Sequence, residues 1–472
     1  MVLLQLLLSP PHAVGTLFDV VLSLYNSYFP HPPRLSLPDR RSLGDFDVDL
    51  HTGFFPPTPL PRLPPSFDLW ENGLASATGR LCLGDDDSEE AKSKHVFGQT
   101  WRDDVGSWPL LSIAELETDL RLLQRAHYVL SWILHLYAHS VPIFPVPPEV
   151  VVVPKSIAVP LVEVSQLLGM APVLTFADTV LWNYELINPA EPLSVTNIRF
   201  RHLFSGTEDE ASFYRSSAKA ELVGVEMLRV FDEYNRLSPN AGDYAAVSKV
   251  SRDLIRLSGI INEINEVIQS VRPTCDPHVF YWQIRPWYSG SGSDGPCWKY
   301  EGVPNDDELL RSGPSAGQSS VMHALDIFLG VDHQTIRKKG SVETKNQHSQ
   351  FMEKMRLYMP KKHRDYLVSL STSSQPIREL AKEESILRDP FNTAVAALQK
   401  LRSEHIKIAC RYVVTMAHTQ SAIGCPIASM WSRLQKDGSS GNALGTGGNT
   451  VTSLLKHGRD ATRQTALPGR SI

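Results

Sequence analysis

The sequence predicts an all-α protein in which a smaller helical domain is followed by a larger one. Apolar residues recur at three- and four-residue spacing over long stretches, as amphipathic helices require. The longest such stripe includes Val247, Leu254, Ile261 and Ile268 and ends before Pro273. Strands do not alternate with helices along the chain, and no internal repeat is visible. Both observations favour an all-α class over an α/β fold.

Three regions are expected along the chain. Residues 1–44 should be a poorly ordered extension, because the apolar run Val2–Leu8 is too short to span a bilayer and lacks a positive flank. A weak secretory signal or a membrane-surface anchor is the alternative. Residues 45–150 should form the smaller domain and residues 151–472 the larger one.

The composition is that of an ordinary globular protein and excludes some partners. Hydrophobic residues make up 42% of the 472 residues, charged residues 21%, and the formal net charge is −5. No long basic run is present, so nucleic acid is not expected as a partner. Five scattered cysteines cannot form a disulfide framework, which favours a reduced, cytoplasmic setting. Stable membrane insertion is not expected.

Local signals place the first elements. Prolines from Phe54 to Pro65 predict an extended arm rather than part of the core. Ser112 and Glu115 have the spacing of a capping box, which predicts that a helix begins at Ser112. The Val- and Pro-rich segment from Pro145 to Pro160 predicts an inter-domain connector.

Later signals place the remaining elements. Asp389 and Pro390 suit the N-cap and first turn of a helix whose apolar stripe continues past residue 400. A short apolar helix is expected over Val321–Gly330. The segments 332–350 and 437–448 are expected to be mobile loops.

The usual signatures of hydrolases and nucleotide-binding proteins are absent, so histidines become the main candidates. His405 lies on the apolar stripe of its helix, where a neutral imidazole suits the proximal position of a haem iron. A core histidine bonded to a backbone carbonyl is the alternative. His127 lies in a similar position and competes with it. His135 and His139 form an i, i+4 pair without a third ligand, which is a weak metal signal.

An arginine among aromatic residues predicts a site for an aromatic amino acid. Arg285 lies in FYWQIRPWYSGSG, which begins at Phe280. Its planar fork matches a carboxylate, and the aromatic residues provide walls for a ring. An arginine that merely extends from an aromatic-rich turn to solvent is the alternative.

Small residues mark three further segments. Phe213, Ser217, Ala220 and Gly224 share one helix face, which leaves space for a neighbouring helix or for a flat cofactor. GPSAGQSS, residues 313–320, either caps the following helix or lets the backbone approach a ligand. GTGG, residues 445–448, is a lid hinge or a linker.

Taken together and in order, these segments resemble the indoleamine 2,3-dioxygenase family, and its fungal members especially. The resemblance covers roughly residues 45–460. The segments that carry it are DVDLHTGFFPP from Asp47, KSIAVP from Lys155, PVLTFADTVLWNY from Pro172, the Phe213–Glu221 helix, FYWQIRPWYSG from Phe280, YEG from Tyr300, GPSAGQSS from Gly313, MRLYMPKKHRDYL from Met355, LRSEHIKIACRY from Leu401 and GTGG from Gly445.

The resemblance implies a small helical domain over a large helical domain that binds haem b. It implies His405 as the iron ligand, with Arg402 facing a haem propionate, Asp326 paired with Arg402, and Ser315 beside the haem. It implies Ser217 and Arg285 as the residues closest to catalysis, Arg285 anchoring the substrate carboxylate. The substrate-binding residues it implies are Phe176, Val180, Phe213, Tyr214, Phe280, Arg285, Ser315, Ala316 and Thr446.

The resemblance also implies an activity. A member of this family would use O2 to open the C2–C3 bond of L-tryptophan, giving N-formylkynurenine, the first step of the kynurenine pathway. It would need an electron donor to keep haem ferrous, and we expect a monomer. A haem-binding sensor or structural homologue with little turnover is the alternative, and a helical interaction protein without haem is a third. Phe176, Thr179, Pro314 and Asn449 depart from the vertebrate pattern, and Thr179 should add a polar group to the pocket.

Overall fold

A computed structural model describes residues 42–86, 88–142, 148–292, 296–333, 344–419 and 451–468. Two compact units are distinguished, residues 1–42 and residues 43–472. Every element described below belongs to the second unit. The all-α prediction is confirmed, because its only sheets among the described residues are two short two-stranded ones. The proposed domain boundary near residue 150 stays a prediction.

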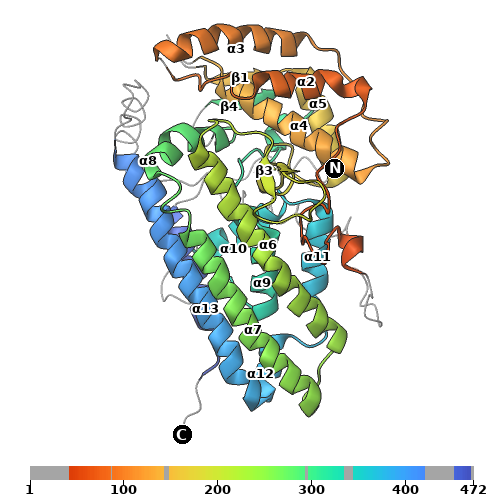
Figure 1. The fold of residues 1–472 in the computed structure, drawn as a ribbon, viewed down its shortest axis with the longest axis vertical. Coiled ribbons are helices and arrows are strands. Elements are labelled where there is room, and N and C mark those ends of the chain that lie inside the picture. Colours follow the sequence, from red (N-terminus) through yellow and green to blue (C-terminus); the bar gives the residue numbers. More distant parts are fainter. Residues whose placement is uncertain are drawn as a thin grey trace, which may run out of the picture. The chain divides into compact units, whose positions relative to one another are not determined.

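The 3-10 helix η1 (Leu43–Phe46) packs against α11 (Lys361–Ser371). The next elements gather at one end of the unit (Figure 1). They are the 3-10 helix η2 (Pro65–Phe67), the helices α2 (Asp68–Ala77), α3 (Glu89–Ser107), α4 (Leu120–His139) and α5 (Lys155–Leu168), and the strand β1 (Val150–Val153). β1 pairs in parallel with β4 (Cys297–Tyr300), so a segment from much later in the chain returns to this end. Helix α4 packs against both α2 and α5.

The proline-rich segment belongs to the core, so the prediction of an arm outside the core is wrong. Phe54, Phe55, Leu60 and Leu63 are all at most 3% exposed. Proline keeps this stretch extended, but its apolar side chains still gain from removal from water. The extended backbone therefore lies against the helices and not away from them.

Helix α4 begins at Leu120 and not at Ser112. Asp119 caps it, because its carboxylate accepts hydrogen bonds from the backbone N–H groups of Arg121 and Leu122. Glu115, the other half of the expected capping box, accepts a hydrogen bond from Ser66 instead. An Asp cap immediately before the buried stripe was a stronger start signal than the earlier serine.

The expected connector from Pro145 to Pro160 contains regular structure where it is described, and its role as an inter-domain link stays a prediction. Residues 150–153 form β1, and α5 begins at Lys155 and contains Pro160. Pro160 is the sixth residue of the helix and has no N–H, so α5 lacks one hydrogen bond to the preceding turn at this position. The valines follow the alternating burial of a strand, with Val151 and Val153 buried and Val150 and Val152 exposed.

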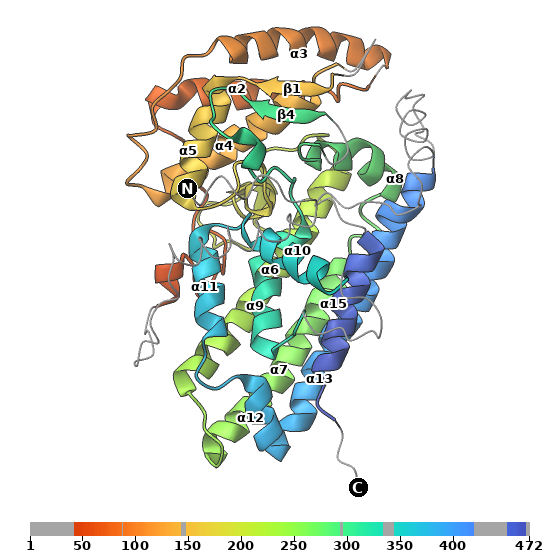
Figure 2. The same ribbon diagram turned by 180° about the vertical axis from the view of Figure 1, so that it is seen from behind.

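Long helices form the other part of the unit (Figures 1 and 2). Helix α7 packs against both α6 and α13, and α15 packs along α13. Their bounds are α6 (Glu208–Leu237), α7 (Tyr244–Gln269), α9 (Ser320–Leu329), α13 (Ser385–Ala409) and α15 (Val451–Thr465). The predicted stripe from Val247 to Ile268 is α7, and its core-facing residues are buried as expected.

Helix α13 starts earlier than predicted. It begins at Ser385, and Pro390 lies inside it rather than in the first turn. The preceding residues end α12 (Ile377–Glu383), and Glu384 is shared as the cap between the two helices. The loop expected over residues 332–350 is interrupted as well, because α10 (Thr344–Arg356) starts within it. The segment 437–448 lies outside the described residues.

Short elements connect these helices. They are the π-helical turns η3 (Ala177–Leu181), η4 (Phe280–Ile284) and η8 (Cys410–Thr415), the 3-10 helices η5 (Arg285–Tyr288), η6 (Asp306–Glu308), η7 (Ala316–Gln318) and η9 (Met416–His418), the strands β2 (Tyr184–Leu186) and β3 (Ile198–Phe200), which pair antiparallel, and the helices α8 (Pro277–Val279) and α11 (Lys361–Ser371).

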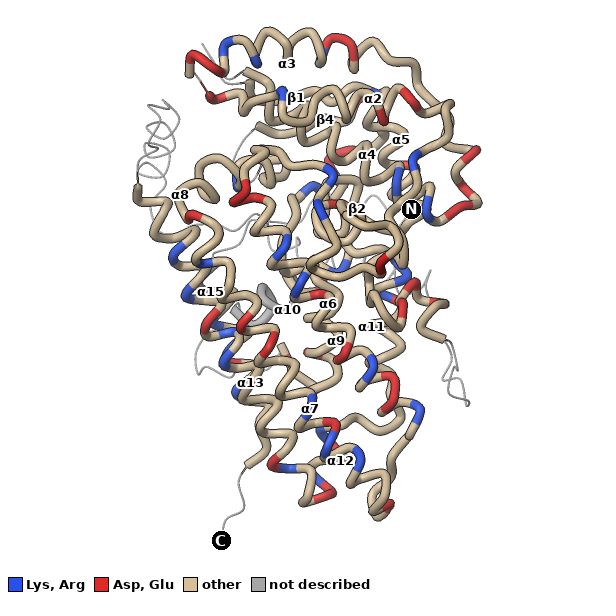
Figure 3. The backbone as a smooth tube through the Cα atoms, viewed as in Figure 1, with Lys and Arg blue, Asp and Glu red and all other residues tan. Residues whose placement is uncertain are grey.

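Acidic and basic residues both occur along α3 and α13 (Figure 3). Among the residues that the structure describes, no helix is long and apolar enough to cross a membrane.

Candidate functional site

His405 is a half-buried histidine whose imidazole is not used by the fold. It lies on α13 between the buried residues Leu401 and Ile408. Within the described part of the chain, neither of its ring nitrogens forms a hydrogen bond. Burial, and next the positive charge of Arg402, lower its pKa, so that the neutral ring with a free lone pair is favoured. A neutral imidazole of this kind is suited to bind a metal.

Of the three competing histidines, only His127 has both ring nitrogens hydrogen-bonded, and Nε2 of His135 has no partner within the described residues. His127 is fully buried, with Nδ1 2.8 Å from a carboxylate oxygen of Asp178 and Nε2 3.1 Å from the carbonyl oxygen of Ala171. His135 and His139 each bond a backbone carbonyl, those of Trp287 and Ser289. Burial, and next the neighbouring His139, lower the pKa of His135 to about 3, which makes it a neutral core residue. No cluster of metal-ligating side chains is found among the described residues.

Arg402 and Asp326 form the predicted ion pair. Nη2 of Arg402 is 2.6 Å from both carboxylate oxygens of Asp326, and Nη1 donates to Thr462 and to the carbonyl of Gly458. His333 also bonds the Asp326 carboxylate, at 3.0 Å. Burial alone would raise the pKa of Asp326, but Arg402 and His333 outweigh it and hold the pKa well below its usual range. The pair joins α9, α13 and α15 one turn before His405.

These residues fit a haem by the chemistry of their donors. A haem needs one neutral nitrogen ligand for its iron and a cation near its carboxylates. His405 offers the first, since both ring nitrogens are unbonded. Arg402 offers the second from the preceding turn of the same helix, although it must share its charge with Asp326.

Aromatic rings connect the helix of His405 with α6. The ring centroid of Phe280 lies 4.9 Å from that of Phe213 on α6 and 5.7 Å from that of Tyr412 in η8, the continuation of α13. Tyr412 is fixed because its hydroxyl donates to the carbonyl of Cys275 at 2.6 Å. Phe213 remains half-buried, so its ring has surface left for a ligand. The structure therefore brings together the two predicted ring-binding residues, Phe213 and Phe280.

Arg285 starts η5, immediately after the turn that carries Phe280. It is half-buried, and its guanidinium carbon lies 5.3 Å from the ring centroid of Tyr281. A guanidinium can stack on a ring and match a carboxylate with its planar fork of N–H donors. The role of Arg285 as the carboxylate anchor stays a prediction.

Ser217 lies one turn after Phe213 and is half-buried. Its hydroxyl donates to the carbonyl of Phe213 at 3.3 Å, which leaves the oxygen lone pairs available to accept a hydrogen bond. Gly224, further along the same face, serves helix packing: a Cβ there would lie 2.4 Å from Cγ1 of Val321 on α9. The part of this face with Phe213 and Ser217 is thus half-exposed, whereas the part with Gly224 packs against α9.

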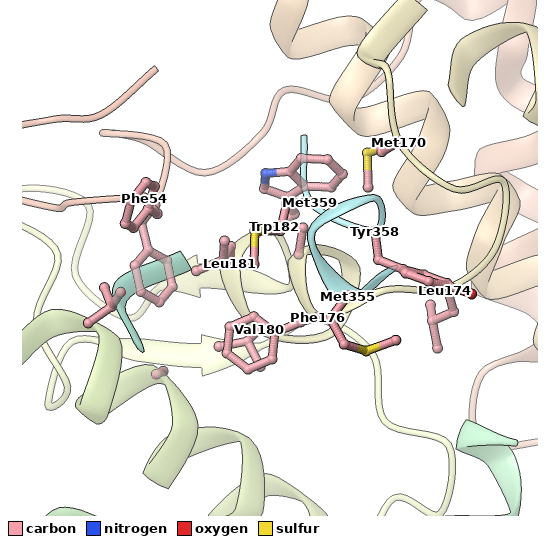
Figure 4. Close-up of a cluster of buried hydrophobic side chains, with 14 of the residues drawn as sticks. Phe54, Met170, Leu174, Phe176, Val180, Leu181, Trp182, Met355, Tyr358 and Met359 are labelled. Carbon is pink, nitrogen blue, oxygen red and sulfur yellow. The ribbon is translucent and has the colours of Figure 1, made fainter. Parts of the chain in front are cut away.

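Phe176 and Val180 lie in a buried hydrophobic cluster together with Leu181, Trp182 and Met355 (Figure 4). Thr179 lies in the same turn. Its side chain is 3% exposed, and its hydroxyl donates to the carbonyl of Thr175 at 3.1 Å. Its effect on the substrate pocket stays a prediction.

Gln318 links the turn that carries Phe176 to the strip of Ser315 and Ala316. Its side-chain oxygen accepts from the backbone N–H of Phe176 at 2.8 Å, and its side-chain nitrogen donates to the carbonyl of Gly313 at 3.0 Å. Ser315 caps η7 through its hydroxyl, which accepts from Gly317, and Ala316 is exposed. The small residues of this strip therefore act as a cap and still leave surface for a ligand.

A buried carboxylate, that of Glu221, contacts the segment 313–320 at Ser319. Glu221 of α6 accepts a hydrogen bond from the hydroxyl of Ser319, and its second carboxylate oxygen has no partner. Burial raises its pKa to about 7.

Two of the predicted or noted positions, Thr446 and Asn449, lie outside the described residues. Sequence reasoning did not single out Gln318, Tyr288, Tyr412 or Asp178, which the structure places beside the predicted residues. Each lies inside a quoted segment, but only a tertiary contact distinguishes it from its neighbours.

Comparison with known proteins agrees with this geometry. The family model described as indoleamine 2,3-dioxygenase matches residues 42–465. Human indoleamine 2,3-dioxygenase 2 is 30% identical over 93% of this chain and 99% of its own length. Rat indoleamine 2,3-dioxygenase 1 is 27% identical over 91% of this chain and 96% of its own length. A Fusarium equiseti protein named 6-hydroxytryptophan 2,3-dioxygenase is 27% identical over 87% of this chain and 94% of its own length. With its match to the family model over most of its length, the chain belongs to the indoleamine 2,3-dioxygenase family, whose members are haem-dependent dioxygenases acting on tryptophan-like substrates.

Proposed function

We propose that this dioxygenase binds haem b through His405 and opens the indole ring of L-tryptophan at the C2–C3 bond to give N-formylkynurenine. In this reaction both atoms of O2 enter the product, one at each carbon of the broken bond. Haem supplies the activation of oxygen when it is bound. The observation that carries the proposal is that His405, with neither ring nitrogen bonded among the described residues, follows the Arg402 guanidinium by one turn of the same helix.

The chain's own residues bind and orient the substrate. Phe213 and Phe280 provide a tilted pair of rings for the indole, and Arg285, beside Tyr281, would hold the carboxylate. Ser217 offers an oxygen that can accept a hydrogen bond beside Phe213. Binding the amino acid at both ends holds its indole ring in one orientation. Such orientation of a substrate lowers the activation free energy by several kcal/mol in enzymes generally. No acid or base residue is required of the protein, because the cofactor carries the oxidation.

L-tryptophan is proposed because its indole ring suits the pair of Phe213 and Phe280 and its carboxylate suits a guanidinium such as that of Arg285. The animal and fungal relatives are named for indoleamine in general. The Fusarium relative is named for 6-hydroxytryptophan, which makes a ring-hydroxylated tryptophan the second candidate. Both substrates share the amino-acid end that Arg285 would hold.

The test is an absorption spectrum of the haem-loaded protein during anaerobic reduction, followed by L-tryptophan and air. A Soret band of histidine-ligated haem and then growth of the N-formylkynurenine absorbance are expected. With labelled O2, both oxygen atoms should appear in the product by mass spectrometry. A haem band without product from any indole would favour the sensor alternative, and failure to bind haem would contradict the whole proposal.

We further propose a cytoplasmic monomer that needs an external electron donor to keep the haem iron ferrous. The four described cysteines, Cys82, Cys275, Cys297 and Cys410, are free thiols, which suits a reduced compartment.

A further inference from the structure

The guanidinium of Arg402, which we assign to a haem propionate, is held by two other helices. Nη2 lies 2.6 Å from both carboxylate oxygens of Asp326 on α9. Nη1 donates to the hydroxyl of Thr462 and, at 3.0 Å, to the carbonyl of Gly458, and both acceptors belong to α15. Each of these two nitrogens carries two N–H groups, so one N–H group, that of Nε, remains without a partner among the described residues.

The acceptors on α15 give the ion pair of Arg402 and Asp326 an unusual form. Arginine and a carboxylate frequently pair through two nitrogens, with two parallel hydrogen bonds. Here a single nitrogen, Nη2, contacts both oxygens of Asp326, while Thr462 and Gly458 occupy Nη1. A hydroxyl and a carbonyl carry no negative charge, so α15 orients the guanidinium without neutralising it further.

The hydroxyl of Thr462 can act only as an acceptor toward Arg402. The side chain is buried, and its hydroxyl donates to the carbonyl of Gly458 at 2.8 Å. Since its one proton is used in this way, the oxygen keeps its lone pairs, one of which accepts from Nη1. The hydroxyl, the carbonyl and Nη1 therefore form a closed ring of hydrogen bonds.

Helix α15 runs beside α13 (Figure 2), and side chains of neighbouring helices hold its C-terminal end. Arg378 of α12 donates to the carbonyls of Thr465 and Gln464, at 3.1 and 3.3 Å, and the last carbonyls of a helix have no partner within it. Asn392 of α13 bonds both the N–H and the carbonyl of Leu467, at 2.8 and 3.0 Å. These bonds fix the position of α15 along α13, and with it the position of the hydroxyl that contacts the guanidinium.

We propose that Thr462 is a positioning residue for the cofactor, because its hydroxyl holds Arg402 in the orientation in which the guanidinium pairs with a haem propionate. This inference rests on the proposed function, since it takes haem b as the cofactor. A cation that is already oriented loses less conformational freedom when the propionate arrives, so haem is bound more tightly. Thr462 acts through Arg402 and need not touch the haem.

The first experiment measures the rate at which haem passes from the ferric protein to an excess of apomyoglobin. Thr462→Val keeps the branched shape but lacks the hydroxyl, and we expect it to release haem about ten-fold faster, a factor typical of one hydrogen bond to a charged group. Thr462→Ala, which also lacks the hydroxyl, should behave alike. Thr462→Ser, which keeps it, should release haem at nearly the original rate. An unchanged rate in both variants without the hydroxyl would overturn the proposal.

Thr465→Val is the matched control. Thr465 lies on the same helix, is equally buried, and donates its hydroxyl to the carbonyl of Ala461 at 3.1 Å, as Thr462 does to that of Gly458. Within the described residues no arginine donates to the hydroxyl of Thr465, so this variant should release haem at the original rate. Equal acceleration in the two valine variants would mean that haem release depends on the stability of α15 alone, which contradicts the proposal.

The second experiment replaces haem with its dimethyl ester, in which both propionate charges are blocked. Arg402 then has no carboxylate to bind, so the original protein and Thr462→Val should release the ester at the same rate. If Thr462→Val releases haem and ester faster by the same factor, the hydroxyl supports the fold and not the contact with the propionate, and the positioning role is rejected.

The outcomes also separate this inference from the proposed reaction. If Thr462→Val accelerates the release of haem but not of its ester, while no indole is turned over, the positioning role stands and the dioxygenase reaction fails. If L-tryptophan is opened but the variant releases haem at the original rate, the reaction stands and the positioning role is rejected. A protein that binds no haem contradicts both.

Discussion

At the scale of single residues, the environment of each histidine decides what it can do. His127, His135 and His139 lie on an apolar helix, as His405 does, and the sequence alone left His127 as a competitor. The structure places oxygens against both ring nitrogens of His127 but against only one ring nitrogen of His135 and of His139. His405 has neither ring nitrogen bonded among the described residues and follows Arg402 by one turn. The distinction depends on contacts from distant segments, so periodicity along one helix cannot reveal it.

Replacing His405 with Ala should abolish haem binding and leave the fold intact, because no hydrogen bond of the described protein depends on this ring. Added imidazole should restore part of the Soret absorbance by occupying the vacated position. His51→Ala, at an exposed position, is the control and should bind haem normally. A His405→Ala protein with an ordinary histidine-ligated haem spectrum would remove His405 as the ligand.

Replacing Arg285 with Leu should chiefly raise KM for L-tryptophan, by about 10- to 100-fold, since hydrogen bonds to charged groups contribute roughly 1.5–3 kcal/mol. Steady-state kinetics with tryptamine, which has no carboxylate, provides the internal control. The variant and the original protein should differ little on tryptamine. Unchanged KM and kcat for L-tryptophan would show that Arg285 does not hold the carboxylate.

At the scale of elements, single side chains fix how segments of the site meet. Gln318 uses both ends of its amide to join the turn of Phe176 to the backbone at Gly313. Gln318→Glu keeps an acceptor for Phe176 but places a carboxylate against the Gly313 carbonyl. We expect KM to rise several-fold, although Gln318 need not touch the substrate, and the free energy of unfolding to fall by about 1–3 kcal/mol.

Gln318→Met, which has similar length but neither hydrogen-bonding group, should show the same loss of substrate binding. Urea denaturation and steady-state kinetics on both variants test whether Gln318 supports substrate binding as well as the stability of the fold. A large loss of stability with unchanged KM would mean that Gln318 supports the fold alone.

Helices α6 and α9 approach closely at Gly224. Gly224→Ala should lower the free energy of unfolding by about 1–3 kcal/mol, because its Cβ would meet Val321 at 2.4 Å and force the helices apart. Gly259→Ala on α7 is the matched control. Its new Cβ meets nothing within 4 Å, so better helix propensity should stabilise the protein by up to about 1 kcal/mol. Combining Gly224→Ala with Val321→Ala should recover part of the loss, and equal effects of the two glycine changes would contradict the close approach.

Among the elements, buried helix stripes could be predicted from the sequence more reliably than helix starts. The stripe of α7 was predicted over nearly its whole length, because burial on one face repeats with the helical period. The starts of α4 and α13 were wrong, since caps compete locally and the winning cap depends on neighbouring segments. The site residues came from a family resemblance rather than from periodicity, and Tyr288 and Gln318 became visible only through their contacts.

At the scale of the whole molecule, several buried groups couple stability to pH. His135, His323 and His363 are at most 2% exposed, and burial, as the largest cause, lowers their pKa values to about 3, 4 and 4. Between pH 6.5 and about 4 the unfolded chain therefore binds protons at these residues that the folded chain does not. Each of them makes the free energy of unfolding fall by about 1.4 kcal/mol per unit of acidification in this range.

Glu221 acts in the opposite direction. Its pKa is raised to about 7, so between pH 7 and about 4.5 the folded state binds a proton that the unfolded state does not, and acidification stabilises the fold. The net effect of these four groups is a loss of about 3 kcal/mol per pH unit between pH 6 and 5.

Urea denaturation followed by circular dichroism at several pH values measures this slope. His363→Leu should make the slope shallower and Glu221→Gln should make it steeper, each by about 1.4 kcal/mol per pH unit, whereas His51→Gln should change neither. A free energy of unfolding that is constant from pH 7 to pH 5 would mean that the histidines bind protons as readily in the folded state as in the unfolded state. The two variants would then lose their opposite effects.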